Sequence, residues 1–322
     1  RQADPHGTKA TSLARNSGGN SPLDVYAYGV VSSSTLYRVR GAFPAAEGYA
    51  EIEDVLHMTG GEAANSSIVL SQLGARVKLD GNWIGDDDNG RRTKTLLDDF
   101  GIDSSRLRLR KNYRGVQEVV FAAGDTRTIF GTYRALLNNE EWNAPREEDI
   151  TAARVVSLDP FFAEPATRVA EIASGASIPV VTVDCRYDSP LLGHVTAVVV
   201  AESFIRENYP DESLEDLFRQ YLAATTGLVV FTFGSKPAWY ARRGGNTRIM
   251  PPFAVEAIDT TGGGDSFRAG IVYAFLRGWG DERAMAFAAA VAAINCTRFP
   301  GVLNSPSVDE AEAFIDAAGP AR

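Results

Sequence analysis

Five short runs of almost uninterrupted apolar residues constrain the fold of this chain more than any other feature. They are "DVYAYGVV", "ARVVSLD", "IPVVTVD", "VTAVVVA" and "GLVVFTF", at 24–31, 153–159, 178–184, 195–201 and 227–233. Such continuity is typical of strands buried on both faces. Helical patterns lie between the runs, as in "SLEDLFRQYLAA", whose apolar residues share one face behind the N-cap residue Ser213. We therefore predict an α/β protein with a parallel sheet that is covered on both sides.

One segment interrupts this alternation. Residues 113–134, "YRGVQEVVFAAGDTRTIFGTYR", contain two β-rich runs about a Gly-Asp turn and predict a hairpin. Together with the β-like stretch 36–52, this hairpin is expected to form a small sheet outside the main one.

Composition narrows the classes of function. A net charge of -9 and a pI near 5.0 argue against a general binder of nucleic acid or of anionic membranes. No apolar stretch approaches the ~20 residues of a membrane span. The two cysteines lie outside any CxxC or Cys/His cluster, so we expect no disulfide framework or structural zinc and a cytoplasmic protein. Residues 1–23 are interpreted as a disordered extension or a vector-derived remnant.

The segment "DTTGGGDSF" (259–267) is the strongest candidate for chemistry. Glycines just ahead of a helix let backbone N–H groups approach an anion, and the helix dipole favours negative charge at that end. The pattern therefore indicates a cradle for a phosphate or an oxyanion. Asp265, in the first turn, is either a helix residue favoured by the dipole or a base held beside the anion.

Three rival motifs fit the same letters poorly. The GxxxxGK[ST] string of a Walker A loop is absent from the sequence, and the third glycine of a Rossmann fingerprint is replaced by Phe267. A serine hydrolase with Ser266 as nucleophile would need a histidine base, and the three histidines, His6, His57 and His194, all precede the segment.

The segment, extended to "DTTGGGDSFRAG", resembles the C-terminal signature of ribokinase-type (PfkB) sugar kinases, DTxGAGDxFxxG. "GGEAANSSIVLSQLGARVKLDGNWIGDDDNG" (60–90) resembles the N-terminal signature of that family, "FTFGSK" (231–236) its TLGxxG segment, and "AVAAINCTRFPG" its closing helix and loop. The resemblance covers about residues 24–318. It implies a ribokinase-like three-layer α/β/α sandwich over 24–320, with a small β-sheet lid whose strands are about 36–52 and 113–134.

The resemblance also implies a reaction, the transfer of the γ-phosphate of ATP to an alcohol with Mg²⁺ accompanying the nucleotide. Asp265 would take the proton of the attacking hydroxyl, and Gly262, Gly263 and Gly264 would offer backbone donors to the transferring phosphate. Asp259 and Thr261 would hold a monovalent cation, potassium in this reading.

Binding residues follow from the same match. Those expected on the sugar side are Ser34, Gly60, Gly61 and Asn65, and those expected on the nucleotide side are Thr232, Gly234 and Ser235. Glycine lets the backbone approach hydroxyl groups closely, and an amide side chain both donates and accepts hydrogen bonds.

The sequence departs from the family pattern at positions that matter for the substrate. Ser34 stands where many members have a sugar-gripping Asp, and a hydroxyl cannot give the charge-assisted grip of a carboxylate. Glu62 stands where ribokinases often have Lys, Glu202 is a weak substitute for the NxxE motif, and Pro237 replaces the last glycine of TLGxxG. The usual recognition of a furanose diol is therefore not expected.

The lid segment carries Arg127, Tyr133 and Arg134, which we expect on strands that close over the sugar. Arg134 is assigned to substrate binding because Arg pairs with carboxylates and phosphates; the alternative is a solvated strand edge guarded by charge. The predicted acceptor is a primary hydroxyl of a hexose, a keto-sugar or a sugar acid.

Two other functions stay open from the sequence. A nucleoside (adenosine-type) kinase of the same family would want an aromatic pocket, to which Phe43, Tyr49 and Phe130 could contribute. A non-catalytic sugar-binding regulator would explain the loss of the acid at Ser34, whereas the intact "GGGD" opposes it. The resemblance also implies a homodimer formed through the lid sheets.

Overall fold

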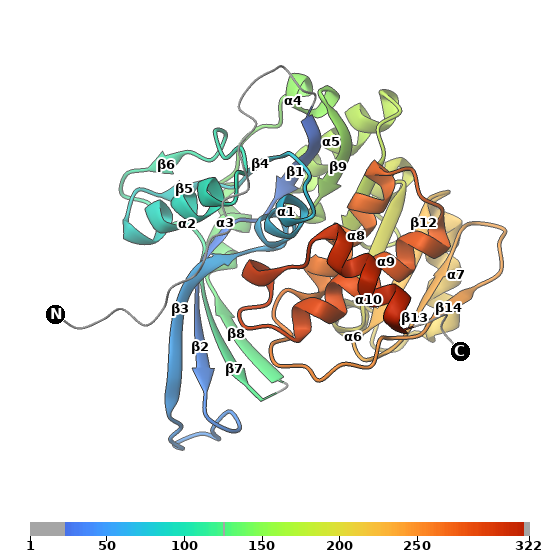
Figure 1. The fold of residues 1–322 in the computed structure, drawn as a ribbon. Coiled ribbons are helices and arrows are strands. Elements are labelled where there is room, and N and C mark those ends of the chain that lie inside the picture. The colour runs from blue at the N-terminus through green and yellow to red at the C-terminus, as the bar shows by residue number, and fades with distance from the viewer. Residues whose placement is uncertain (1–22, 125, 319–322) are drawn as a thin grey trace.

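The computed structural model describes residues 23–124 and 126–318. The predicted extension therefore lies outside the described residues, except for Leu23, which begins the first strand. Figure 1 shows a layered body from which a small sheet projects.

The main sheet has eight strands in the order β14-β13-β12-β11-β10-β9-β1-β4. Its strands are β1 (Leu23–Gly29), β4 (Val77–Gly81), β9 (Ala153–Leu158), β10 (Val180–Val183), β11 (Ala197–Ala201), β12 (Leu228–Phe233), β13 (Lys236–Ala241) and β14 (Arg248–Met250). All pairs from β12 to β4 are parallel, whereas β13 and β14 add an antiparallel edge. The five apolar runs are thus confirmed as the central strands β1, β9, β10, β11 and β12.

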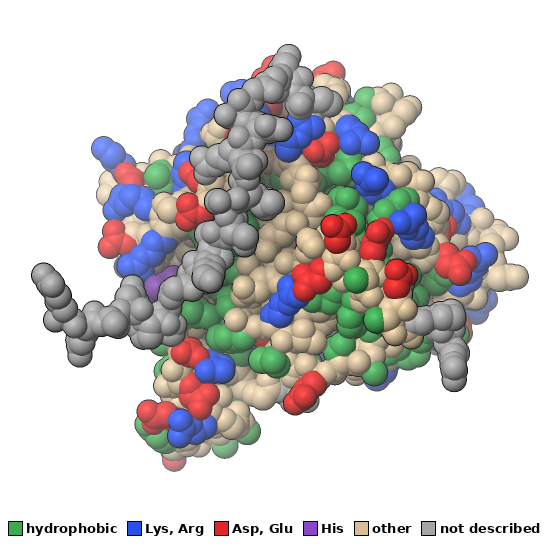
Figure 2. Space-filling model, in the orientation of Figure 1, with side chains coloured by type: hydrophobic (Ala, Val, Ile, Leu, Met, Phe, Trp, Pro, Cys, Tyr) green, Lys and Arg blue, Asp and Glu red, His purple; other side chains and the backbone are tan. Residues whose placement is uncertain are grey.

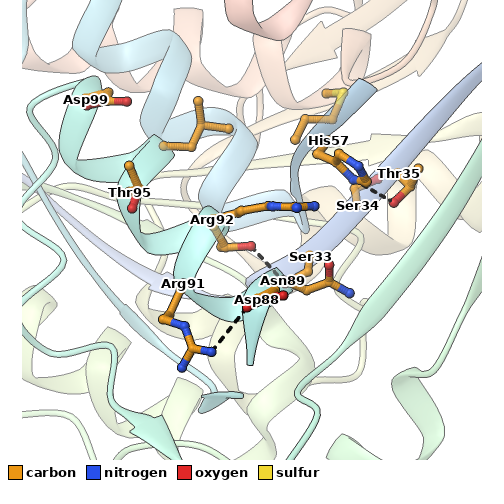
Figure 3. A pocket seen from close by; sticks show the side chains of 13 residues that line it. Ser33, Ser34, Thr35, His57, Asp88, Asn89, Arg91, Arg92, Thr95 and Asp99 are labelled. Atoms are coloured by element: carbon orange, nitrogen blue, oxygen red, sulfur yellow. Dashed lines mark hydrogen bonds and ion pairs between the residues drawn. The ribbon is translucent and has the colours of Figure 1, made fainter. Parts of the chain in front are cut away.

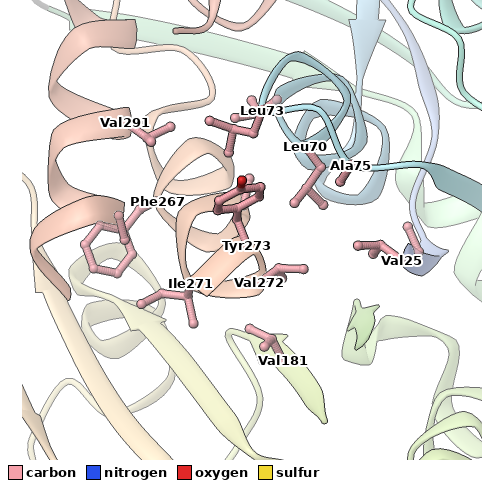
Figure 4. Close-up of a cluster of buried hydrophobic side chains, with 14 of the residues drawn as sticks. Val25, Leu70, Leu73, Ala75, Val181, Phe267, Ile271, Val272, Tyr273 and Val291 are labelled. Atoms are coloured by element: carbon pink, nitrogen blue, oxygen red, sulfur yellow. The ribbon is translucent and has the colours of Figure 1, made fainter. Parts of the chain in front are cut away.

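Helices cover both faces of this sheet. One hydrophobic core joins the strands to helices α1 (Glu62–Gln72), α8 (Gly263–Leu276), α9 (Asp281–Cys296) and α10 (Val308–Ala318). A second core joins the opposite face to α5 (Ala163–Gly175), α6 (Glu202–Asn208) and α7 (Leu214–Ala224). Along β1, Val25 and Ala27 belong to the first core, and Tyr26 and Tyr28 to the second. Figure 4 shows Phe267 and Val272 of α8 among the first set, so the predicted three layers are confirmed.

The projecting sheet has four strands in the order β3-β2-β7-β8. They are β2 (Ser32–Val39), β3 (Ile52–Gly60), β7 (Gln117–Ala123) and β8 (Thr126–Gly131). The predicted hairpin is therefore present, but the expected strand 36–52 is largely the connection between β2 and β3. Its residues "RGAFPAAEGYAE" (40–51) include a proline and two glycines, which interrupt a strand ladder.

The remaining elements connect the sheets. They are the helices α2 (Asp88–Asp99), α3 (Tyr133–Asn139) and α4 (Glu147–Thr151), the short strands β5 (Ile84–Gly85) and β6 (Leu109–Arg110), and 3-10 turns at Pro160–Phe162, Pro190–His194 and Val302–Asn304. Within the described ranges, no helix is long and apolar enough to cross a membrane. Acidic and basic side chains are interspersed over the face seen in Figure 2.

Candidate active site

The glycine turn opens α8 at the carboxyl ends of the parallel strands, the edge where open α/β sheets bind ligands. Gly262 is the N-cap residue, with φ 72°. A Cβ atom there would lie 2.3 Å from Val302 Cγ2, so both conformation and space require glycine. Among the described residues, the amides of Gly262, Gly264 and Asp265 have no acceptor, whereas that of Gly263 donates to the Thr260 carbonyl at 3.2 Å. The turn therefore presents an anion cradle, to which Asp265 rather than Gly263 contributes an amide.

Asp265 lies against the other predicted signature. The Nδ2 group of Asn65 on α1 donates to Asp265 Oδ2 at 2.8 Å. The N-cap residue of α1 is Gly61, with φ 85°, and a Cβ there would lie 2.4 Å from the Val30 carbonyl oxygen. This turn sends the chain from the projecting sheet directly into the helix that carries Asn65. Two motifs 200 residues apart thus meet at one carboxylate.

The protonation of Asp265 suits a proton acceptor. Burial raises the pKa of Asp265 to about 6; Arg268 and Asn65 lower it and Asp159 raises it. A carboxylate with such a pKa is largely ionised near neutral pH and is more basic than an ordinary aspartate.

A buried ion pair lies near the carboxylate of Asp265, and the sequence interpretation did not identify it. The side chains of Arg268 and Asp159 are both fully buried and form a salt bridge. Arg268 also donates to the Glu62 carbonyl and to Ser66 Oγ, and Asp159 Oδ2 accepts from the Val30 amide at 2.7 Å. Two signals could have found the pair: a lone arginine within an apolar helix, and an acid directly after a buried strand.

Glu62, the first residue of α1, is a third carboxyl group near the reacting centre. Burial, with the negative charges of Asp159 and Asp265, raises the pKa of Glu62 to about 8. Its side chain is partly exposed, and among the described residues no side chain forms a salt bridge or hydrogen bond with its carboxylate.

The projecting sheet supplies a fourth carboxyl group, that of Glu118 on β7. Its Oε1 accepts from Ser34 Oγ at 3.2 Å, and its Oε2 accepts from Ser32 Oγ at 3.1 Å and from the Tyr133 hydroxyl. Glycine at position 60 makes room for it, because a Cβ there would lie 2.6 Å from Glu118 Oε1. The sequence interpretation noted the acid missing at Ser34 but did not recognise that the neighbouring strand provides one.

Of the three predicted lid residues, Arg127 lies on a strand as expected, whereas Tyr133 and Arg134 do not. Arg127, on β8, donates to the Thr260 carbonyl beside the glycine turn. Tyr133 and Arg134 lie on α3 instead of a strand, because the β8 ladder ends at Gly131. Arg134 is exposed, and its assignment to substrate binding has no contact that supports it.

The aromatic residues considered for a nucleobase pocket face away from Asp265. Phe43 and Phe130 pack edge-on against Phe121, at 5.6 and 6.1 Å between ring centroids, on the sheet face opposite Val120. Tyr49, in the connection between β2 and β3, is 85% exposed.

The three predicted nucleotide-side residues lie at the same edge of the main sheet. Thr232 is near the end of β12, and Gly234 and Ser235 form the exposed turn into β13. Beside this turn, Lys236 Nζ contacts Glu202 Oε1 at 2.9 Å. Glu202 is thus paired with a lysine beside the turn that joins β12 to β13.

Asp259 holds the loop in front of the cradle. Its Oδ1 accepts from the Thr261 amide at 2.9 Å, and its Oδ2 accepts from the Gly301 amide at 3.2 Å. Thr261 Oγ1 is buried without a hydrogen-bond partner among the described residues. No cluster of three or more His, Cys, Asp or Glu residues that could hold a metal occurs within residues 23–124 and 126–318.

A separate pocket of about 570 Å³ lies between β2, β3 and α2 (Figure 3). Ser34 and His57 line it, and Arg92 extends toward them. The glycine turn and Asp265 are not among its lining residues, so this pocket does not contain the proposed reacting groups.

Comparison with known proteins gave consistent matches. The family model described as "pfkB family carbohydrate kinase" matches residues 27–307. An ATP-dependent ribose-1-phosphate kinase from Halopiger xanaduensis is 28% identical over 84% of this chain and 91% of its own length. A fructoselysine 6-kinase from Shigella flexneri is 26% identical over 73% of this chain and 88% of its own. The structure of Arabidopsis thaliana ribokinase complexed with ribose and ATP is 19% identical, with a TM-score of 0.75 over 92% of this chain and 99% of that one.

Proposed function

This chain belongs to the pfkB family of carbohydrate kinases, and we propose that it transfers the γ-phosphate of ATP to a primary hydroxyl of a hexose, a keto-sugar or a sugar acid. The observation that supports this reaction best is the hydrogen bond from Asn65 to Asp265 at the start of α8. It joins a sugar-side residue to a carboxylate that also borders the anion cradle. The two relatives compared above act on different substrates, so they do not select one sugar for this chain.

In the proposed mechanism, Asp265 accepts the proton of the sugar hydroxyl as its oxygen attacks the γ-phosphorus. Asn65 orients the carboxylate through its Nδ2 group, and Arg268, one turn further along α8, favours the ionised form. The free amides of Gly262, Gly264 and Asp265 face the phosphoryl oxygens, where charge develops during transfer.

The nucleotide is expected to bring its own metal ion. The described residues lack a metal-holding cluster, and the donors at the glycine turn are amides, which bind phosphate rather than Mg²⁺. Mg²⁺ bound to the phosphates of ATP would neutralise their charge. For a monovalent cation, the buried and unpartnered Thr261 Oγ1 is the supporting observation, and ATPase rates in potassium and sodium buffers would test it.

ADP release from Mg-ATP tests the function directly, with a panel of ketohexoses, pentoses, sugar acids and nucleosides. We expect one class of sugar to stimulate release, and Asp265→Asn to lower kcat by about 10²–10⁴-fold while leaving ADP binding intact by calorimetry. If the Asn variant retains wild-type turnover, Asp265 is not the base. Stimulation by nucleosides alone would favour a nucleoside kinase, which Phe43, Tyr49 and Phe130 do not support.

We also propose that the protein is a homodimer through the outer face of the projecting sheet. Tyr37 stacks on Phe121 there at 5.2 Å between ring centroids, and Phe130 and Val55 are 56% and 50% exposed. Contiguous exposed apolar side chains of this kind mark interaction sites. Sedimentation should give a dimer for the wild type and a monomer for Phe130→Asp; a monomeric wild type would contradict the proposal.

A further inference from the structure

We propose that the sugar phosphorylated by this protein carries a positively charged amino group, which pairs with the carboxylates of Glu62 and Glu118. This inference rests on the proposed function, because it concerns the acceptor of that reaction. The charges around the acceptor favour an amino-substituted sugar over the unsubstituted hexoses, keto-sugars and sugar acids of the proposed function.

The sugar side of the site has an excess of carboxyl groups. Glu62, Glu118 and Asp265 lie on α1, on the projecting sheet and on α8, and these elements meet through the bond from Asn65 to Asp265 and the close approach of Gly60 to Glu118. The buried cation of this region, Arg268, is bound to Asp159, a fourth acid. Removing such charge from water without a counter-ion is costly, so a bound ligand that adds negative charge would be disfavoured.

Glu62 and Glu118 act on a common neighbour. The Tyr133 hydroxyl donates to Glu118 Oε2. Burial is the main cause that raises the pKa of Tyr133, and the negative charges of Glu118 and Glu62 raise it further. A Cβ atom at Gly60 would lie 2.6 Å from Glu118 Oε1, so the backbone at Gly60 approaches this carboxylate closely. Glu62 follows Gly60 by two residues in the chain. Both glutamates therefore lie beside the Gly60–Gly61 turn, Glu118 through this contact and Glu62 through its place in the chain.

A polar atom without a partner points to a ligand near this turn. Asn65 is 7% exposed, and while its Nδ2 group binds Asp265, its Oδ1 atom is buried and has no hydrogen bond among the described residues. An amide oxygen only accepts, so it requires a donor. An ammonium group or a sugar hydroxyl supplies one.

Among the described residues, no arginine or lysine forms a salt bridge with Glu62 or Glu118, and the salt bridge of the buried Arg268 is with Asp159. Arg127 is bonded to the Thr260 carbonyl, and Arg134 is exposed on α3. Burial and the negative charges of Asp159 and Asp265 raise the pKa of Glu62 to about 8, although Arg268 lowers it. A sugar acid is therefore the least suitable of the three classes, whereas a protonated amine would restore the ionised form of Glu62.

The test compares sugars that differ in charge at one position. Initial rates of ADP release are measured for fructose, 1-amino-1-deoxyfructose and its N-acetyl derivative, for glucose, glucosamine and N-acetylglucosamine, and for gluconate as the anion. We expect kcat/KM for one amine to exceed that of its neutral parent and of its N-acetyl form by about 10–100-fold, the range of a charge-assisted hydrogen bond. The preference should decrease as salt is added.

Single substitutions identify the residues responsible for the preference for an amino sugar. Glu62→Gln and Glu118→Gln should each lower the ratio of kcat/KM between amine and parent by about tenfold or more. Glu282→Gln, an exposed glutamate on α9 with 85% of its side chain exposed, should retain it. Thermal melts of all three variants identify any that fail to fold, and the salt dependence of the wild type needs no variant.

Three results would overturn the proposal. Preference for a neutral sugar or for gluconate would contradict the amine while leaving the kinase function intact. An amine preference retained in both glutamine variants would assign recognition to other residues. No stimulation by any sugar, with ATP still bound, would refute the proposed function and this inference together.

Discussion

Loss of the buried arginine gives the sharpest test of how the site is held together. Arg268→Met removes a guanidinium that is fully buried, with its salt bridge to Asp159 and its bonds to the Glu62 carbonyl and Ser66 Oγ. Asp159 is then a buried carboxylate without its cation. Breaking a buried pair by removal of one partner costs about 3–5 kcal/mol, because the remaining charge is uncompensated.

The chain offers a matched control in Arg242→Met. Arg242 makes two contacts of 2.8 Å with Asp281, but 39% of its side chain is exposed. Pairs of this exposure contribute about 0–1 kcal/mol. Both variants therefore remove the arginine of an Arg–Asp salt bridge, and they differ in how deeply that salt bridge is buried.

The free energy of unfolding is measured by urea denaturation followed by tryptophan fluorescence and circular dichroism, whose coincidence checks two-state behaviour. The double variant Arg268→Met with Asp159→Asn should recover at least half of the loss, since the Asn oxygen still accepts from the Val30 amide. Equal losses of below about 1 kcal/mol in the Arg268 and Arg242 variants would refute the reasoning.

Two further predictions concern the cradle. Because Asp265 must be deprotonated to accept a proton and its pKa is about 6, kcat/KM for the sugar should fall about tenfold per pH unit below that value; a profile that stays flat down to about pH 5 would contradict the assignment. Gly262→Ala should cost about 2–4 kcal/mol, from the left-handed backbone and the 2.3 Å approach to Val302. Gly278→Ala, with φ 67° and no heavy atom within 4 Å, should cost only about 1 kcal/mol, and similar losses in denaturation would show that the clash is relieved.

The sequence predicted the central sheet well, for a physical reason. Runs such as 195–201 are apolar on both faces, and only a strand covered on two sides needs that pattern. Strands β13 and β14 were missed because they pair antiparallel at the sheet edge and include exposed residues such as Lys236 and Ile249. An edge strand carries no continuous apolar signal.

The site was predictable only where a motif is local. Gly262 and Asp265 follow from one short string, and their neighbour Asn65 from another. Glu118 could not be found this way, because its role depends on strand pairing that places it opposite Ser34. Arg134 was misplaced for the same kind of reason: the register of β8 decides where the strand ends, and α3 begins two residues later.

The way the projecting sheet joins the core has a consequence for how such an enzyme changes its acceptor. The β2–β3 hairpin leaves the core just after β1, which ends at Gly29, and returns at Gly60, immediately before α1 (Figure 1). The proposed proton acceptor and the proposed anion cradle belong to a different segment, at the start of α8. The residues proposed to bind the sugar thus lie in other stretches of the chain than those proposed for the chemistry, and exchange of 32–65 and 117–131 would replace the first set while leaving the second unchanged.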